Sequence, residues 1–233
     1  MEKNAGSAGI FAKNNARKCC AGVAGMLQLS CTQKPASHDR QNGSKRCHGK
    51  EDFGMKVAMI GHKDFPSRSG GVEVMVGGLA TSLVKRGYEV TVYNRGLQKG
   101  HNIYTTEGVQ ARRIFTFQKA SLNAMVYSFL ATFDALTRDC DVIHYHAIGP
   151  SVPLVIAKLF GKHTVCTVHG LNWKVDKWGG FASAYLRLGE RVAAKYADDL
   201  VVLSESEWNY FQEKYDRTAI LIPNAVQMRQ PLP

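Results

Sequence analysis

The sequence has no long hydrophobic segment. A membrane-spanning helix needs roughly 18 consecutive apolar residues, and no run in these 233 residues approaches that length. The closest run, at 120–133, is interrupted by Ser121, Asn123 and Ser128. We therefore expect it to form a buried helix and expect no transmembrane helix in the chain.

Two common nucleotide-binding motifs are also missing. The dinucleotide-binding fingerprint G-x-G-x-x-G needs closely spaced glycines after a strand, but the next glycine after Gly61 is Gly70. The G-K-[ST] sequence of a P-loop does not occur either. These absences disfavour an ordinary NAD-dependent enzyme and a nucleoside triphosphatase.

Cysteine is scarce in most of the chain, because four of the six cysteines lie in residues 1–54. This segment carries nine Lys and Arg against four Asp and Glu, which is +5 of the total charge of +11, and only two aromatic residues. Its many Ser, Asn, Gly, Lys and Gln residues bury too little apolar surface to offset the entropy of ordering. We predict that residues 1–54 are a disordered or non-native N-terminal extension.

Two alternatives for this extension are weaker. A secretory signal around Arg17 and Lys18 would have too long a basic part, and Gln28 and Ser30 interrupt its apolar part. A zinc site has candidate ligands but no C-x-x-C or H-x-x-x-H pair with the usual spacing. These candidates are Cys19, Cys20, Cys31, Cys47, His38 and His48.

From Met55 onward, strands that are apolar on both faces alternate with amphipathic helices. The strand-like segments are 55–61, 89–95, 109–117, 141–147, 163–169, 199–204 and 218–223. Helical spacing of apolar residues predicts a helix after most of them. The alternation predicts an α/β fold, a Rossmann-like doubly wound parallel sheet.

The same spacing predicts which helix faces are buried. The apolar stripes are Val72, Val76, Leu79 and Leu83; then Leu122, Val126, Phe129, Phe133 and Leu136; then Phe181, Tyr185, Leu188 and Val192. Gly87 is expected to end the first helix, and Ser204 with Glu207 to cap a later one. Cys140 and Cys166 are expected to be core thiols rather than a disulfide, as suits a reducing cytosol.

A glycine pair follows the first predicted strand. Ligands of doubly wound sheets bind beyond the carboxyl ends of the strands, and Ser69-Gly70-Gly71 stands there, directly before a helix. Backbone N–H groups and the helix dipole at such a place favour a phosphate. A tight turn that needs positive φ explains the glycines equally well, so both interpretations stay open.

Histidines mark the ends of two later strands. His144 and His146 lie on the same side of one strand, and no third metal ligand is evident nearby. We expect His144 to be a hydrogen-bonded core histidine and His146, at the carboxyl end, to belong to a site. His169 closes the next strand, and the loop after it has the residue mixture of a sugar-binding loop or of a lid anchored by buried Trp. The binding candidates in this loop are Asn172, Trp173, Lys174 and Trp178.

Taken in order, five segments resemble the N-terminal domain of the retaining, two-domain glycosyltransferases of family 4 (the glycosyltransferase group 1 superfamily). They are MKVAMIG…SGGVE, DVIHYHA, TVHGLNW…KWG, DLVVLSESE and LIPNAV. The resemblance implies half of a GT-B fold, with the acceptor-side domain at 55–226 and the start of an interdomain hinge at 227–233. Because the chain stops at Pro233, we expect the C-terminal, donor-binding domain to be absent and the chain alone to be inactive.

The resemblance also implies roles for individual residues. Gly70 and Gly71 would lie near the donor diphosphate, and His169 would be the catalytic residue that hydrogen-bonds the transferred sugar. Glu73 would also orient the glycine loop. The acceptor-side residues would be Arg68, Glu73, His146, Asn172, Trp173, Lys174 and Trp178.

The implied reaction moves a sugar from a nucleotide-diphosphate donor to a glycan or lipid-linked acceptor, with retention at the anomeric carbon. No cofactor and no essential metal are expected, and stabilisation of the leaving diphosphate would be the main catalytic contribution. The implied location is cytoplasmic, with peripheral contact at the inner membrane face, which the charge of +6 on residues 55–233 allows.

The alternatives are a non-catalytic glycan-binding module of the same fold and an atypical α/β oxidoreductase. Nucleic-acid binding has no supporting motif.

Overall fold

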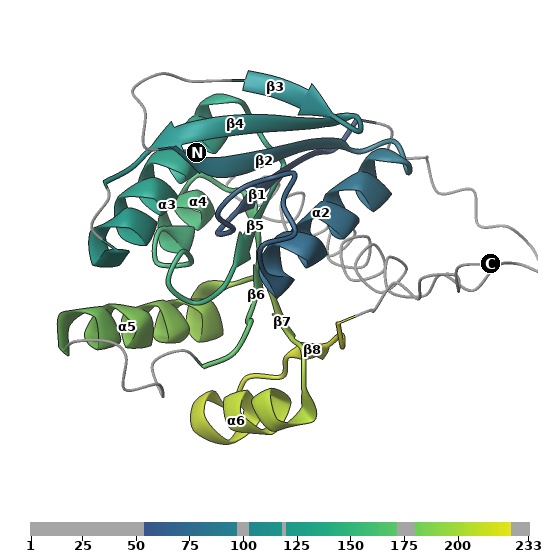
Figure 1. Cartoon of the computed structure of the whole chain (residues 1–233). Helices are drawn as coiled ribbons and strands as arrows, with labels where there is room; N and C mark the ends of the chain where they lie inside the picture. The colour runs from purple at the N-terminus through teal and green to yellow at the C-terminus, as the bar shows by residue number, and fades with distance from the viewer. Residues whose placement is uncertain (1–53, 97–102, 118–119, 172–179, 225–233) are drawn as a thin grey trace, which may run out of the picture.

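A computed structural model describes residues 54–96, 103–117, 120–171 and 180–224 of the chain. The predicted N-terminal extension, apart from Gly54, lies outside these ranges, and so does the predicted start of the hinge at 227–233. Figure 1 shows the described residues as one sheet with helices packed against it.

The described residues form an eight-stranded sheet with the strand order β3-β4-β2-β1-β5-β6-β7-β8. All neighbouring strands pair in parallel except β3 and β4, which are antiparallel. This confirms the predicted Rossmann-like doubly wound fold, although the sequence analysis missed the edge strand β3. The strands are β1 (Lys56–Ile60), β2 (Glu89–Gly96), β3 (Ile103–Thr106), β4 (Val109–Phe115), β5 (Val142–His146), β6 (His163–Thr167), β7 (Asp199–Val202) and β8 (Ile220–Leu221).

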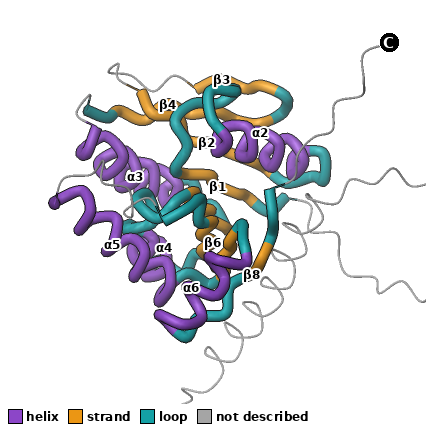
Figure 2. Tube along the Cα trace, turned by 60° about the horizontal axis from the view of Figure 1, so that its bottom comes forward, coloured by secondary structure: helices purple, strands orange, loops and turns teal. Residues whose placement is uncertain are grey.

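Helices cover both faces of this sheet, as Figure 2 shows. On one face, α2 (Gly71–Val84) buries Val76, Leu79 and Leu83 against β1, β2 and β4. On the other face, side chains of four helices join the larger apolar cluster beneath them. These helices are α3 (Ala120–Thr137), α4 (Leu154–Leu159), α5 (Gly180–Tyr196) and α6 (Glu205–Tyr215). None of the helices in the described part of the chain combines the length and hydropathy that crossing a bilayer requires.

The predicted buried face of α3 is confirmed only in part, because Leu136 packs against the core but Phe133 does not. Tyr127, Ala131 and Ala135 are fully buried, whereas Phe133 is 49% exposed. Small side chains let the helix approach the sheet closely, and the Tyr127 hydroxyl donates to the carbonyl of Tyr93 on β2. Of the predicted stripe, Phe133 is turned away from the sheet, while Phe129 is of intermediate burial.

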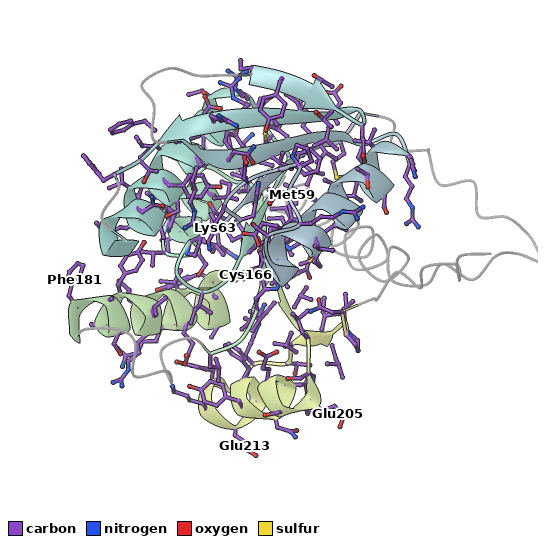
Figure 3. The ribbon with its side chains drawn as sticks, viewed as in Figure 1. Met59, Lys63, Cys166, Phe181, Glu205 and Glu213 are labelled. Carbon is purple, nitrogen blue, oxygen red and sulfur yellow. The ribbon has the colours of Figure 1, made fainter. Side chains whose placement is uncertain are left out.

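The buried face of α5 is predicted only in part. Val192 is buried as expected, but Leu188 is 47% and Phe181 65% exposed. Figure 3 shows Phe181 pointing away from the domain, while Met59 and Cys166 lie in its interior. The helix instead packs through Gly189, where an added Cβ would overlap the carbonyl oxygen of Ile148.

Several local predictions are confirmed. Gly87 has φ 88° at the end of α2, and its N–H donates to Val84 O. Ser204 accepts a hydrogen bond from the Glu207 N–H at the start of α6, and the Glu207 carboxylate accepts one from Leu203 N–H. Cys140 and Cys166 are buried free thiols.

The sheet changes its winding direction between β1 and β5. This switch point is where ligands of doubly wound sheets bind. Gly61 follows β1 with φ 130°, and a Cβ on it would overlap the carbonyl oxygen of His146 at the end of β5. Glycine is therefore required at this position for two reasons. The backbone has positive φ, and the two strand ends approach each other too closely for a Cβ.

Candidate functional site

Four histidines gather at the carboxyl ends of three neighbouring strands. His62 follows β1, His144 and His146 lie on β5, and His169 follows β6. The ring centroids of His144 and His146 are 4.1 Å apart, and those of His146 and His169 are 5.6 Å apart. Because β1, β5 and β6 are parallel neighbours, their carboxyl ends bring together residues that are up to 107 positions apart, as the numbers of His62 and His169 show.

Each of these histidines has a defined hydrogen-bond partner. His144 Nε2 lies 2.7 Å from the Thr167 hydroxyl, which confirms the predicted hydrogen-bonded core histidine. His146 Nδ1 lies 3.4 Å from His169 Nε2. His62 Nε2 lies 2.9 Å from Asn94 Oδ1.

Burial keeps these four rings uncharged at neutral pH. Desolvation lowers the pKa of His62 and of His169 to about 4, and that of His144 to about 3. It also lowers the pKa of His146 well below its usual value, and the neighbouring histidines add to this effect. The cluster therefore offers neutral ring donors and acceptors rather than positive charge.

The glycine pair opens α2 without a left-handed turn. Gly70 is the N-cap residue, with an extended backbone at φ −162° and ψ 163°, and neither Gly70 nor Gly71 has positive φ. The turn interpretation of these glycines is therefore wrong. A Cβ on Gly70 would overlap Oε2 of Glu73, so a larger residue there would require the Glu73 carboxylate to move. A Cβ on Gly71 would meet nothing within 4 Å.

Glu73 connects the glycine pair to the histidines. Its carboxylate is buried and accepts a hydrogen bond of 3.2 Å from the Lys63 N–H, in the loop that follows β1. Its negative charge opposes the burial that lowers the pKa of His169 and of His62. The start of α2 is thus close enough to the histidines for its charge to act on them.

The sequence analysis missed several residues of this site. His62 was not singled out, and neither was its partner Asn94, whose amide nitrogen donates to Phe65 O. Arg95 was missed as well: its guanidinium donates to Gly61 O at 2.9 Å and lies 5.2 Å from the centre of the Tyr127 ring. His62 could have been found from its position directly after the predicted strand at 55–61, and Asn94 and Arg95 from their position at the carboxyl end of the predicted strand at 89–95.

The predicted site residues divide into three groups. Gly70, Glu73, His146 and His169 come together at the switch point, while Arg68 and Gly71 are exposed beside them. His146 is fully buried against His169, so its contact with an acceptor stays a prediction. Within the described ranges, no group of three or more His, Cys, Asp and Glu is arranged to hold a metal ion. The remaining predicted residues, Asn172, Trp173, Lys174 and Trp178, lie outside the described residues.

Two solved structures with a similar fold are titled sucrose-phosphate synthase. The chain is similar to the sucrose-phosphate synthase from Thermosynechococcus elongatus with a TM-score of 0.59 and 17% identity, covering 72% of this chain and 48% of that one. A second structure titled sucrose-phosphate synthase from the same organism gives a TM-score of 0.51 and 13% identity, covering 73% of this chain and 88% of that one. At such identities the likeness shows the fold alone, and the chain spans about half the length of the first of these proteins.

No curated protein matches the chain. A protein-family comparison is more specific, since the model described as Glycosyltransferase Family 4 matches residues 69–230. This match begins at the glycine pair, includes β5 and β6 with their histidines, and extends past β8. With a GT-B type of Rossmann-like domain and a match over more than half of its length, the chain belongs to glycosyltransferase family 4.

Proposed function

We propose that the chain is the acceptor-side domain of a glycosyltransferase. The reaction moves a sugar from a nucleotide-diphosphate donor to a glycan or lipid-linked acceptor, with retention at the anomeric carbon. The observation that carries the proposal is the position of His169 at the switch point of the sheet, next to His146 and within reach of the charge of Glu73 on α2, in a chain of family 4.

His169 acts in this reaction as a neutral hydrogen-bond donor to the transferred sugar. Burial holds its pKa at about 4, so at pH 7 the ring carries no positive charge and does not serve as a general acid. A neutral donor suits a sugar hydroxyl. The leaving phosphate serves as the base, so the domain needs no carboxylate in that role, and no cofactor or essential metal is part of the proposal.

The donor diphosphate is bound at the N-terminus of α2. The backbone N–H groups there have no partner inside the helix, and the helix dipole favours an anion. The carboxylate of Glu73 lies beside Gly70 and repels a phosphate there, whereas Gly71 has open space around it. We therefore place the diphosphate nearer to Gly71 than to Gly70, with Arg68 on the exposed loop beside it and the Asn172–Trp178 loop on the acceptor side.

Transfer needs a second, donor-binding domain in this proposal. Support comes from the length comparison, because the chain covers only 48% of the first solved relative. The domain division at 55–226, with a hinge that begins at 227, belongs to the same proposal.

A transfer assay tests this function. The chain alone and the chain fused after Val226 to a family 4 donor-binding domain are incubated with a panel of nucleotide-diphosphate sugars and with glycan and lipid-linked acceptors. We expect transfer by the fusion only, and a loss of about 100-fold in kcat/KM on His169→Ala, the size typical for removing one preorganised donor. Glu213→Gln on the outer face of α6 is the matched control and leaves the rate unchanged.

Three outcomes would count against the proposal. Transfer by the chain alone contradicts the need for a second domain. Glycan binding without transfer by any fusion favours a non-catalytic binding module. Saturable binding of a nicotinamide dinucleotide, with none of a nucleotide sugar, favours the oxidoreductase.

Contact with a cytoplasmic membrane face is a further part of the proposal, for the lipid-linked class of acceptor. It is supported by the exposed apolar side chains Phe133 on α3 and Phe181 and Leu188 on α5. Sedimentation with anionic vesicles at low salt should recover the chain, and Phe181→Ser should reduce the recovered fraction. Equal recovery with neutral vesicles, or none with anionic ones, contradicts this part alone.

A further inference from the structure

His146 has one ring nitrogen that is paired and one that is not. Its Nδ1 lies 3.4 Å from His169 Nε2, while its buried Nε2 has no hydrogen-bond partner among the described residues. The ring itself is fully buried and lies against the ring of His144. This asymmetry bears on where the protons of the two histidines lie.

Two arrangements of the protons satisfy the contact between His146 and His169, because both rings are neutral at pH 7 and each carries one N–H. In the first, His146 Nδ1–H donates to His169 Nε2, and the unpaired His146 Nε2 is a bare lone pair. In the second, His169 Nε2–H donates to His146 Nδ1, and a buried N–H is left without an acceptor at His146 Nε2.

The first arrangement has the lower free energy. Orphaned buried N–H groups are rare in folded proteins because they lose a hydrogen bond to water without replacement. The neighbouring His62 shows the same choice. Its Nε2 faces Asn94 Oδ1, which can only accept, so the proton is on Nε2 and the unpaired buried atom is the lone pair at Nδ1.

The orientation of Asn94 supports that assignment. Its amide nitrogen lies 2.9 Å from the carbonyl oxygen of Phe65, which can only accept a hydrogen bond. The amide oxygen must therefore be the atom that faces His62. In both histidines, then, the structure leaves a lone pair rather than an N–H without a partner.

We propose that His146 is a positioning residue that sets the tautomer of His169. By donating its Nδ1 proton to His169 Nε2, it holds the proton of His169 on Nδ1. Among the described residues His169 Nδ1 has no hydrogen-bond partner, so this N–H is available to a ligand at the edge of the sheet. That the ligand atom is a sugar oxygen rests on the proposed function, whereas the tautomer does not.

The tautomer is measured directly on the full chain, labelled with 15N, by long-range 1H–15N correlation of the histidine rings at pH 7 without any ligand. We expect a protonated, pyrrole-type Nδ1 and an unprotonated, pyridine-type Nε2 for His169. The preference should be at least about fivefold, the ratio that one ordinary buried hydrogen bond supports. A protonated Nε2 on His169 in the unmodified chain overturns the proposal, whatever the variants do.

Three variants separate positioning from simple packing. His146→Leu removes the donor and should cut the preference for the Nδ1–H tautomer about fivefold. His146→Asn places an amide N–H near the position of Nδ1 and should retain it. His144→Gln changes a ring that contacts His146 but does not bond to His169, and should leave the tautomer unchanged. An unaltered tautomer in His146→Leu overturns the proposal.

This result is independent of the proposed function. If His169 has the expected tautomer but no nucleotide sugar or glycan shifts its ring signals in the chain fused to a donor-binding domain, the positioning role stands and the sugar-transfer function fails. If sugars bind but the tautomer is the opposite one, the function stands and the positioning role fails.

Discussion

Two buried polar groups in this domain differ in how completely they are paired. Glu190 on α5 is fully buried, and its Oε1 accepts hydrogen bonds from Tyr210 at 2.8 Å, Lys214 at 2.9 Å and Tyr215 at 2.6 Å, all on α6. The histidine cluster at the switch point instead leaves His62 Nδ1 and His146 Nε2 without partners among the described residues.

The difference separates a structural group from a candidate site. A buried carboxylate oxygen that accepts three hydrogen bonds joins α5 to α6 and has no accepting capacity left for a ligand. Unpaired ring nitrogens in a buried cluster lower the stability of the folded domain. Such incomplete pairing of buried polar groups is typical of functional sites.

Acid should unfold the domain through the histidine cluster. The unfolded chain binds a proton at each histidine below pH 6.5, whereas folded His62 and His169 do so only near pH 4 and His144 near pH 3. Stability therefore falls as the pH drops from about 6.5 to 4, by about 1.4 kcal/mol per pH unit for each histidine, or about 4 kcal/mol per unit for these three, and His146, whose pKa is also lowered, adds to the slope. Urea unfolding at pH 5, 6, 7 and 8 measures this slope.

The acidic side chains act in a different pH range. Hydrogen bonds from Arg138, Tyr93 and Arg112 to Asp134 outweigh its burial and keep its pKa below 3.8, so this contribution to stability is lost only below about pH 4.

His144→Gln should reduce the slope between pH 4 and 6.5 by about 1.4 kcal/mol per unit. A free energy of unfolding that stays constant from pH 6.5 to 5 would show that these histidines are not held neutral.

Gly61→Ala should disrupt the close packing of the ends of β1 and β5 at the switch point. The added Cβ would overlap the His146 carbonyl oxygen, and φ 130° is strained for alanine, so we expect a loss of at least about 3 kcal/mol in the free energy of unfolding. Gly78→Ala in α2 is the matched control, because its Cβ meets nothing within 4 Å and should stabilise the helix by up to about 1 kcal/mol. Equal stabilities of the two variants, measured by urea unfolding, would contradict the close approach of β1 and β5.

Glu190 provides the contrasting test. Glu190→Ala leaves three donors without their acceptor and should cost about 3 kcal/mol in the free energy of unfolding. Glu190→Gln keeps an acceptor oxygen and should cost about 1 kcal/mol. Neither variant should change the ring signals of His169 or any sugar binding. A change at His169 in a folded Glu190→Gln chain would mean that the two groups are coupled and the comparison is wrong.

The fold could be predicted from the sequence because a strand that is covered on both faces consists mostly of apolar residues. This pattern does not depend on which helix covers the strand, as the segments at β1 and β5 show. The prediction failed in part on the buried face of α3, where apolar spacing favours the large residue Phe133 but close packing on the sheet requires Ala131 and Ala135. In that helix the approach distance to the sheet, which is a tertiary property, decides the face.

Residues of the candidate site could be predicted where each lies at the end of a recognisable strand. They were missed where the site depends on contact between two segments that are far apart in the sequence. His146 and His169 each close an apolar strand, so the common edge of a parallel sheet brings them together. His62 lies in a loop without periodicity, and its partner Asn94 is 32 residues away, so no local pattern connects the two. The unpaired nitrogens that suggested a role for His146 become visible only with all neighbouring side chains in place.

The most direct test of a sugar-transfer site is a residue-resolved titration of the 15N-labelled chain, fused after Val226 to a family 4 donor-binding domain, with nucleotide-diphosphate sugars and glycan acceptors. The account predicts that the amide signals of Gly70, Gly71 and Gly170 and the ring signals of His169 shift in a saturable way, while those of Tyr210 and Lys214 on α6 do not. Shifts confined to α6, or none at the switch point with any sugar nucleotide or glycan, would contradict it.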